Sequence, residues 1–428
     1  MKNYILESYG CQLNMAEGNA LDILLKGAGF TKTEDSAIAD AVILNTCSVR
    51  KSAENRIWGR LSFYHHIKKD VHPLTIIVTG CMAERLKDEL LAEAPYVDAV
   101  IGTNEKMNIV TYLQGNGLEN EEKYRFMSSY YNEGDFSSYV PIMNGCNNFC
   151  SYCIVPYVRG REISRPVDEI VNEVRALDAK GVKEITLLGQ NVNSYNYNGT
   201  VFPQLLTEIC RNLDNIEFVR FDSPHPKDFS PELIDVIARE ERVCKHIHLP
   251  MQSGNTRILQ LMNRKTTREK FFSLVDNMRE KIEGLTFSTD VMVGFPSESE
   301  EEYEDTLSAM EYLSPIEAFM YYYNVREGTP AASMSEQLSD EEKVARLERL
   351  ISEQLKRASE LKTKRVGMIS RAVVTGVTRD DKSLFLARNA HNEMITFNPG
   401  DTGIKTGDIV TLKTNRLKGN TYIGELVK

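Results

Sequence analysis

The stretch NGCNNFCSYCIVPYVRGR, residues 144–161, places three cysteines within eight positions, at Cys146, Cys150 and Cys153. Three thiolates leave one coordination position of a metal site without a protein ligand, and water would fill this position on zinc. In a four-iron cluster the same gap leaves one iron open to a small molecule. The C-x3-C-x2-C spacing on a loop favours the four-iron cluster, because each thiolate must reach a different corner. A zinc loop or a chance cluster of cysteines is the alternative.

A second set of cysteines recurs near the N-terminus, at Cys11, Cys47 and Cys81, each directly after an apolar run that predicts a buried strand. The C-terminal ends of successive parallel strands share one edge of a sheet, so we expect these three thiols to converge there. The following helix N-termini would stabilise thiolates. This predicts a second three-thiolate metal site, with three buried structural cysteines as the alternative. Cys210 and Cys244 are expected to be small buried core residues.

The pattern around both sets predicts an α/β protein. Strand and helix alternate over residues 1–115, which predicts a doubly wound parallel sheet. Residues 116–137 have no clear period and are expected to form a linker. Six strand–helix units over residues 138–362 predict a partial (β/α)6 barrel, with its chemistry at the C-terminal strand ends, where Cys146 falls. Short β runs separated by turns over residues 363–428 predict a small antiparallel barrel.

Composition limits the class of protein further. The chain has 428 residues, no apolar run long enough for a transmembrane helix and no signal-peptide pattern, so we expect a cytoplasmic protein. Clustered cysteines in a reducing compartment bind metal or perform chemistry more often than they form disulfides. The formal charge of −10 argues against a simple nucleic-acid binder. Residues 364–428 are basic, however, which indicates that this tail meets a polyanion, unless its charge is ordinary variation among small β domains.

Several long motifs resemble the methylthiotransferases of the radical S-adenosylmethionine superfamily, specifically the tRNA (MiaB-like) type. The resemblance covers essentially the whole chain, and the motifs are YGCQLN, NTCSVRKSA, TGCMAE, GCNNFCSYCIVPYVRGREISRP, LLGQNVNSY, HLPMQSGN, MNRKTTRE and DVMVGFPSESEEEY. It implies a radical S-adenosylmethionine barrel in the middle and a TRAM-like barrel at the C-terminus. CQLN and TCSVR favour the isopentenyladenosine branch over the sister groups that act on threonylcarbamoyladenosine or on a ribosomal-protein aspartate.

The resemblance implies a reaction and its cofactors. The enzyme would add a methylthio group to carbon 2 of isopentenyladenosine, 3′ of the anticodon. It would use two 4Fe–4S clusters, one at each cysteine set, and two S-adenosylmethionine molecules. One cofactor molecule would donate the methyl group and the other the 5′-deoxyadenosyl radical. The partners implied are a tRNA anticodon stem-loop that carries the isopentenyl group, a reductant such as flavodoxin or ferredoxin, and a sulfur donor. A monomer without membrane contact is expected. A non-catalytic iron–sulfur protein that binds RNA is the rival of another class.

Residues at the predicted strand ends and near the cysteine loop are further site candidates. Those expected to bind the cofactor are Gly189, Gln190, Asn191, Ser223, His248, Gln252, Gly294 and Arg161. Those expected to contact RNA are Arg159, Arg165, Arg371, Arg388, Arg416 and Lys418. A purely structural role is the alternative for each of them.

Overall fold

The computed structural model describes residues 3–48, 51–117, 124–128, 131 and 134–427, and it divides into two compact units. The first unit consists of Met1–Tyr130, Tyr139–Asn147 and Cys153–Arg165. The second consists of Tyr131–Ser138, Asn148–Tyr152 and Pro166–Lys428. Residues 118–123, 129–130 and 132–133 of the expected linker lie outside the described residues. No helix among the described ranges is long and apolar enough to cross a membrane.

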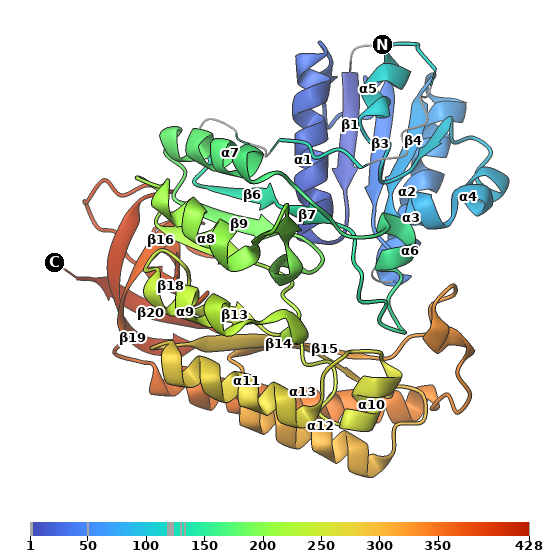
Figure 1. Cartoon of the computed structure of the whole chain (residues 1–428). Coiled ribbons are helices and arrows are strands. Elements are labelled where there is room, and N and C mark those ends of the chain that lie inside the picture. Colours follow the sequence, from blue (N-terminus) through green and yellow to red (C-terminus); the bar gives the residue numbers. More distant parts are fainter. Residues whose placement is uncertain (1–2, 49–50, 118–123, 129–130, 132–133, 428) are drawn as a thin grey trace. The chain divides into compact units, whose positions relative to one another are not determined.

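The first unit contains a five-stranded sheet whose neighbouring strands all run parallel, in the order β2-β1-β3-β4-β5 (Figure 1). The strands are β1 (Asn3–Ser8), β2 (Thr31–Lys32), β3 (Ala41–Thr46), β4 (Thr75–Gly80) and β5 (Ala99–Ile101). The helices between them are α1 (Gln12–Gly27), α2 (Lys51–Asp70), α3 (Cys81–Arg85), α4 (Lys87–Glu93) and α5 (Asn108–Leu113).

Alternate side chains of β3 enter two separate cores, one on each face of this sheet. Val42 and Leu44 pack with Leu61 of α2, whereas Ile43 packs with Leu21 of α1. A sheet that is apolar on both faces needs helices on both, so its strands are continuous apolar runs. The expectation of a doubly wound sheet is confirmed.

The first unit also includes the two flanks of the cysteine loop. The short strands β7 (Met143–Asn144) and β8 (Ile163–Ser164) pair antiparallel, and helix α6 (Val155–Arg159) lies between them in the chain. Ile154 and Val158 pack against Cys81, which explains why this segment joins the N-terminal sheet. The structure therefore groups residues 139–147 and 153–165 differently from the sequence-based boundary at 138. The boundary at 362 remains a prediction.

Six strands form a partial barrel, and five of them lie wholly in the second unit. They are β6 (Ser137–Pro141, which begins in this unit), β9 (Glu184–Leu188), β12 (Phe218–Phe221), β13 (His246–His248), β14 (Thr286–Val293) and β15 (Glu317–Tyr322). Two three-stranded sheets, β12-β9-β6 and β13-β14-β15, are linked by a parallel bridge from Val219 to Val243. The outer helices are α7 (Val167–Ala179), α8 (Phe202–Arg211), α9 (Pro231–Arg239), α10 (Thr256–Leu261), α11 (Arg268–Lys281) and α12 (Glu300–Leu313). The partial (β/α)6 barrel is confirmed.

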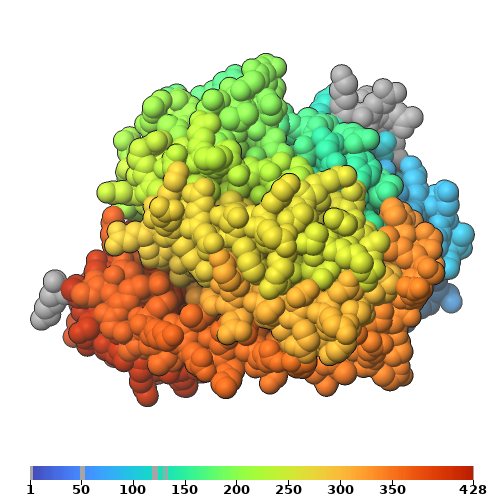
Figure 2. Space-filling model, turned by 60° about the horizontal axis from the view of Figure 1, so that its bottom comes forward, coloured from blue at the N-terminus to red at the C-terminus, as the bar shows by residue number. Residues whose placement is uncertain are grey.

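A long helix, α13 (Asp340–Lys364), leads to a small closed barrel with the strand order β16-β17-β18-β20-β19. Figure 2 shows the orange-red surface of this barrel continuing from the orange surface of the preceding helix. Its strands are β16 (Ile369–Val377), β17 (Phe385–Asn389), β18 (Met394–Phe397), β19 (Ile409–Lys418) and β20 (Thr421–Leu426). One pair, β18 with β20, is parallel, which corrects the expectation of a wholly antiparallel barrel. An odd number of strands cannot close with every neighbouring pair antiparallel.

Candidate active site

The register of the N-terminal sheet brings its three cysteines to one edge. Thr46 at the end of β3 lies opposite Gly80 at the end of β4, so Cys47 and Cys81 leave adjacent strands at the same level. Cys11 follows β1, which pairs with the other side of β3. Cys47 and Cys81 are buried and Cys11 is exposed.

Two glycines make this approach possible. Gly10 has φ +109°, and a Cβ atom on it would lie 2.1 Å from the Cβ of Cys47. Gly80 has φ +95°, and a Cβ atom there would lie 2.3 Å from the carbonyl oxygen of Thr46. Both the backbone conformation and the space exclude a side chain, so these glycines set how closely the cysteine-bearing turns meet.

Arg159 of α6 reaches the same edge and is only 3% exposed. Its Nε donates a hydrogen bond to the Cys81 Sγ at 3.3 Å. Its other two nitrogens hold both carboxylate oxygens of Glu17 in α1, at 2.7 and 3.0 Å. Glu17 also accepts from Lys106 and from the Tyr124 hydroxyl at 2.8 Å. Burial alone would raise the pKa of Glu17, but Arg159 and Lys106 lower it to about 2.

One thiol at this edge, that of Cys11, has a lowered pKa. A hydrogen bond with Cys47 and the charge of Arg159 lower the pKa of Cys11 to about 6. Cys11 therefore favours the thiolate, which is the form that binds metal. Across the described ranges, no three His, Cys, Asp or Glu side chains are already placed to hold a metal ion. Instead, the Cys11 thiol forms a hydrogen bond with Cys47, and the Cys81 sulfur accepts one from Arg159.

The second cysteine set lies on the loop between β7 and β8. The pair of Asn144 with Ile163 closes the base of this loop, and the Cys146 amide donates to the Gly160 carbonyl oxygen at 3.1 Å. Cys146 and Cys153 belong to the first unit and Cys150 to the second.

A second buried arginine, Arg264, lies beside Cys150 in the second unit. Its Nη1 is 3.8 Å from the Cys150 Sγ, and its Nη2 donates to the Pro250 carbonyl oxygen at 2.8 Å. The Asn263 side chain adds a hydrogen bond to the Phe149 carbonyl oxygen at 2.8 Å, which fixes the backbone just before Cys150. Both residues lie in the motif MNRKTTRE, and this motif is the signal by which the sequence could have identified them as site residues.

The structure places most of the expected cofactor residues at the C-terminal strand ends of the second unit. Gly189, Gln190 and Asn191 follow β9, and Ser223, which is exposed, follows β12. In that segment the buried His225 was not expected from the sequence.

The strand ends of β13 and β14 supply the remaining candidates. His248 lies within β13 and bonds Ser288 at 3.0 Å and Asp290 at 3.2 Å. Gln252 is buried, adopts φ +68° and bridges to Val291. Arg161 is exposed and belongs to the first unit, whereas the other cofactor candidates belong to the second.

Gln190, Asn191 and His225, in the segments after β9 and β12, and Arg264, beside Cys150, each have a buried polar atom with no hydrogen-bond partner among the described residues. These atoms are Gln190 Oε1, Asn191 Oδ1, His225 Nε2 and Arg264 Nε. Buried polar groups are nearly always paired in folded proteins, so such a set is expected where a polar ligand binds. Burial and the charge of Arg264 lower the pKa of His225 to about 2, so its ring is neutral.

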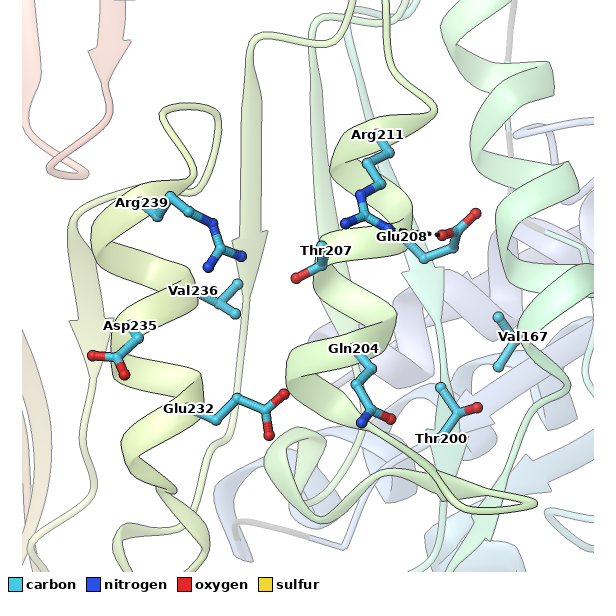
Figure 3. A pocket seen from close by; sticks show the side chains of 10 residues that line it. All are labelled: Val167, Thr200, Gln204, Thr207, Glu208, Arg211, Glu232, Asp235, Val236 and Arg239. Carbon is cyan, nitrogen blue, oxygen red and sulfur yellow. Dashed lines mark ion pairs between the residues drawn. The ribbon is translucent and has the colours of Figure 1, made fainter.

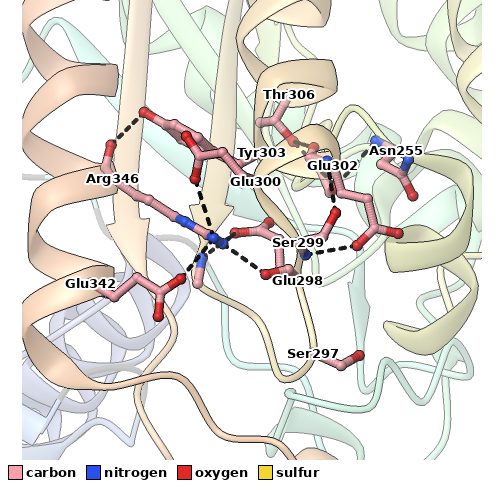
Figure 4. Close-up of polar contacts among 12 residues, drawn as sticks. Asn255, Ser297, Glu298, Ser299, Glu300, Glu302, Tyr303, Thr306, Glu342 and Arg346 are labelled. Carbon is pink, nitrogen blue, oxygen red and sulfur yellow. Dashed lines mark hydrogen bonds and ion pairs between the residues drawn. The ribbon is translucent and has the colours of Figure 1, made fainter.

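Gly294 ends β14 in a turn that is held by a buried carboxylate. Its amide donates to Glu298 at 2.6 Å, and Arg346 of α13 donates to the same carboxylate at 2.9 Å (Figure 4). A Cβ atom on Gly294, which has φ +69°, would lie 2.6 Å from Lys343 Cγ. The turn therefore depends on glycine and on contacts from the long helix.

The expected RNA contacts separate into buried and exposed residues. Arg159 and Arg165 are buried in the first unit, at 3% and 5% exposure, so their contact with RNA stays a prediction without an exposed side chain to support it. Arg388 pairs with the buried Glu184 of β9, and Arg371 pairs with Glu217 at 2.9 Å. Arg416 and Lys418, both exposed on β19, remain accessible to a polyanion.

A groove of about 770 Å³ lies elsewhere, between the outer helices α8 and α9 (Figure 3). Its walls carry charges of both signs, from Glu208, Arg211, Glu232, Asp235 and Arg239. In barrels of this kind the chemistry lies at the C-terminal strand ends rather than between the outer helices. We therefore do not assign the site to this groove.

The donor sets at both sites fit iron–sulfur clusters. Each set offers three cysteines, and each has a buried guanidinium beside one sulfur, Arg159 at Cys81 and Arg264 at Cys150. Cysteine thiolates are the ligands that hold such clusters, and N–H groups near the sulfurs are a usual part of these sites. The unpartnered polar atoms of the barrel are suited to a ligand with amino, carboxylate and hydroxyl groups.

The chain is similar to known proteins over its whole length. A model of the Radical SAM superfamily matches residues 140–310, and a model of the uncharacterized protein family UPF0004 matches residues 3–102. A curated tRNA-2-methylthio-N(6)-dimethylallyladenosine synthase from Treponema pallidum is 41% identical, over 99% of each chain. Another from Bacteroides fragilis is 40% identical, over 100% of this chain and 96% of its own.

Solved structures with lower identity share the fold. The radical S-adenosylmethionine methyltransferase TsrM from Kitasatospora setae matches with a TM-score of 0.58 and 16% identity, over 78% of this chain and 77% of its own. The radical enzyme OxsB matches with a TM-score of 0.53 and 13% identity, over 81% of this chain and 56% of its own.

Proposed function

The chain belongs to the tRNA-2-methylthio-N(6)-dimethylallyladenosine synthase family, and on this premise we propose that it adds a methylthio group to carbon 2 of isopentenyladenosine beside the anticodon of tRNA. The observation that carries the proposal is the 41% identity to a relative of this name over 99% of both chains. The radical S-adenosylmethionine domain makes the chain a radical enzyme of the transferase class.

The N-terminal cysteines are the proposed ligands of one 4Fe–4S cluster. Cys11, Cys47 and Cys81 leave neighbouring strands at one sheet edge, and the lowered pKa of Cys11 favours its thiolate. Arg159 donates to Cys81 and keeps a positive charge beside the thiolates. These residues would hold the cluster and offset its negative charge.

The loop cysteines are the proposed ligands of the other cluster. Cys146, Cys150 and Cys153 would bind it, and Arg264 would orient the Cys150 sulfur. When bound, two clusters and two S-adenosylmethionine molecules would supply the sulfur carrier, the methyl group and the radical that removes hydrogen from carbon 2.

The remaining expected site residues are proposed to hold substrate and cofactor. Gln190, Asn191 and His225 have unpartnered polar atoms that would orient a polar ligand. Gly189, Ser223, His248, Gln252, Gly294 and Arg161 stay proposed cofactor residues. The exposed Arg416 and Lys418 would contact phosphates of the anticodon stem-loop.

Four further features complete the proposal: a reductant, a sulfur donor, a cytoplasmic location and a monomeric state. A reductant such as flavodoxin or ferredoxin would supply electrons, and a separate sulfur donor would restore the sulfur after each turnover. Because tRNA is the proposed substrate, we propose that the enzyme lies in the cytoplasm. We propose that it acts as a monomer.

The test uses anaerobically reconstituted protein, dithionite, S-adenosylmethionine and an isopentenylated anticodon stem-loop. The RNA is digested, and the methylthio nucleoside and 5′-deoxyadenosine are both measured by mass spectrometry. Both products are expected. The matched controls are stem-loops that carry unmodified adenosine or threonylcarbamoyladenosine. Product on the threonylcarbamoyl control alone would overturn the substrate assignment, and the absence of both products would overturn the reaction.

A further inference from the structure

Helix α6 connects Cys153 of the loop set with the N-terminal cysteines, and all of these residues belong to the first unit. It begins two residues after Cys153 of the loop set and ends at Arg159, which donates to Cys81 of the N-terminal set. Val158 of this helix and Ile154, the residue just before it, pack against Cys81 as well. The segment that leaves one set of thiols therefore shapes the surroundings of the other.

The charges around Arg159 do not balance. Two buried cations, Arg159 and Lys106, share the single carboxylate of Glu17, and all three side chains are 2% exposed. The other close partners of this network are neutral: Asn14 accepts from Lys106 at 2.9 Å, and Asn144 accepts from Arg159 at 2.9 Å. A buried, uncompensated charge is costly, so one unit of positive charge is left for an anion at this edge.

The sulfurs are the groups that this excess charge faces. The Arg159 Nε points at the Cys81 Sγ at 3.3 Å, while its remaining nitrogens are held by Glu17 and Asn144. The bidentate grip of Glu17 fixes the plane of the guanidinium and so aims the third N–H. Hydrogen bonds to ligand sulfurs and nearby charge are two of the factors that set cluster reduction potentials.

We propose that Arg159 is a positioning residue that holds Cys81 and raises the reduction potential of the N-terminal cluster, with Glu17 moderating its charge. The proposal rests on the proposed N-terminal cluster. An N–H bond and a positive charge both favour the reduced, more negative form of the cluster. Removing Glu17 must therefore shift the potential in the opposite direction from removing Arg159.

The experiment isolates this cluster in the full-length protein by combining Cys146→Ala, Cys150→Ala and Cys153→Ala. Anaerobic redox titration followed by electron paramagnetic resonance gives the midpoint potential. In this background Arg159→Met is expected to lower the reduced-to-oxidised ratio at a fixed potential about tenfold, which is about 59 mV for a one-electron couple. Arg159→Lys should recover part of the shift, because it keeps the charge but not the planar fork.

Two further variants distinguish an effect on the reduction potential of the cluster from an effect on folding. Glu17→Gln keeps the shape of the side chain and is expected to raise the potential. Arg60→Met is the matched control, since Arg60 also forms an ion pair in this unit, with Glu7, and donates to Tyr64 at 2.8 Å. Its potential should stay at the parent value while its melting temperature falls.

The outcomes are distinct. Opposite shifts for Arg159→Met and Glu17→Gln support the proposal, and shifts of the same sign or no shift overturn it. If Arg159→Met does not fold, the sign for Glu17→Gln decides. If the triple-alanine parent binds no cluster under conditions that load the unmodified protein, the two-cluster scheme of the proposed function fails, and the tuning proposal fails with it.

Discussion

Each unit has a buried arginine beside a cysteine, yet the two arginines have different surroundings. Arg159 is clamped by both oxygens of Glu17 and by Asn144, and every nitrogen has a hydrogen-bond acceptor. Arg264 donates to one backbone oxygen and lies near Cys150, while its Nε has no partner among the described residues. Every nitrogen of Arg159 is thus engaged before anything binds, whereas Arg264 keeps a polar atom free for a ligand. This difference suits one site that carries sulfur and another that receives a cofactor molecule.

The largest expected effect comes from breaking the second site. Cys150→Ala should abolish 5′-deoxyadenosine formation, because one corner of the cluster loses its thiolate. Liquid chromatography with mass spectrometry checks this in reconstituted enzyme. Cys210→Ala is the control, since burial raises the pKa of the Cys210 thiol to about 12 and the residue lies in a helix core. Cofactor cleavage by Cys150→Ala at the unmodified rate would contradict the assignment.

Breaking the first site should separate the two activities. Cys47→Ala is expected to stop formation of the methylthio nucleoside while 5′-deoxyadenosine still forms, because the cleavage site is left intact. The same assay measures both products from one reaction. If this variant still made methylthiolated RNA, Cys47 would not be needed to carry sulfur and the two-site scheme would be wrong.

Substitution of Arg264 tests whether the two arginines have different roles in cofactor cleavage. Arg264→Lys keeps the charge but loses the fork that spans Cys150 and Pro250, and we expect cofactor cleavage to slow about 10–100-fold. Arg159→Lys should leave cleavage of S-adenosylmethionine within about twofold of the unmodified rate, on the same scale of outer-shell effects. Initial rates of 5′-deoxyadenosine formation test both. Equal losses in the two variants would remove the functional distinction between the two arginines.

The smallest expected effect is a pH dependence of stability in the second unit. Burial, followed by the charge of Arg220, lowers the pKa of His246 to about 3. In the unfolded chain His246 has a pKa of about 6.5, so only the unfolded state gains a proton as the pH falls from 6.5 toward 3. The contribution of His246 to the free energy of unfolding is therefore complete above pH 6.5 and is lost as the pH falls toward 3. Between pH 6.5 and 5 the free energy of unfolding should fall by about 2 kcal/mol.

Urea unfolding of the apoprotein at both pH values measures this difference. His246→Asn should make the difference smaller, because the variant has no ring to protonate. A difference that stayed unchanged in His246→Asn would assign the dependence to other groups.

The sequence predicted the fold because its signals were local and periodic. Apolar runs that each end in a cysteine identified β1, β3 and β4, and parallel topology then implied the shared edge. The parallel contact of β18 with β20 was missed because strand order within a barrel is a long-range property that no local pattern carries. The grouping of α6 with the N-terminal sheet was missed for the same reason.

The burial of charged residues was not evident from the sequence, either for the arginines or for Glu17. Arg159 and Arg165 looked like phosphate-binding residues because they are basic and follow a loop, but buried partners hold them. Glu17 was overlooked, although it stands in α1 among Leu13, Ala16 and Ala20, which are buried. A carboxylate at a core position indicates a buried cation that comes from elsewhere in the chain, and only the three-dimensional structure identifies which one.

The ion pair of Arg388 with Glu184 has a consequence for how freely the C-terminal barrel can be exchanged. Glu184 lies within β9, is 1% exposed and also accepts from Arg220 at 2.8 Å, and Val373 of the small barrel packs on Phe218 and Cys244 nearby. If this barrel were fused to another catalytic core, Arg388 would need a carboxylate there and Val373 would need an apolar surface. The barrel is therefore part of the catalytic core's own architecture, and exchange between relatives should succeed only when strand β9 and its carboxylate are exchanged with it.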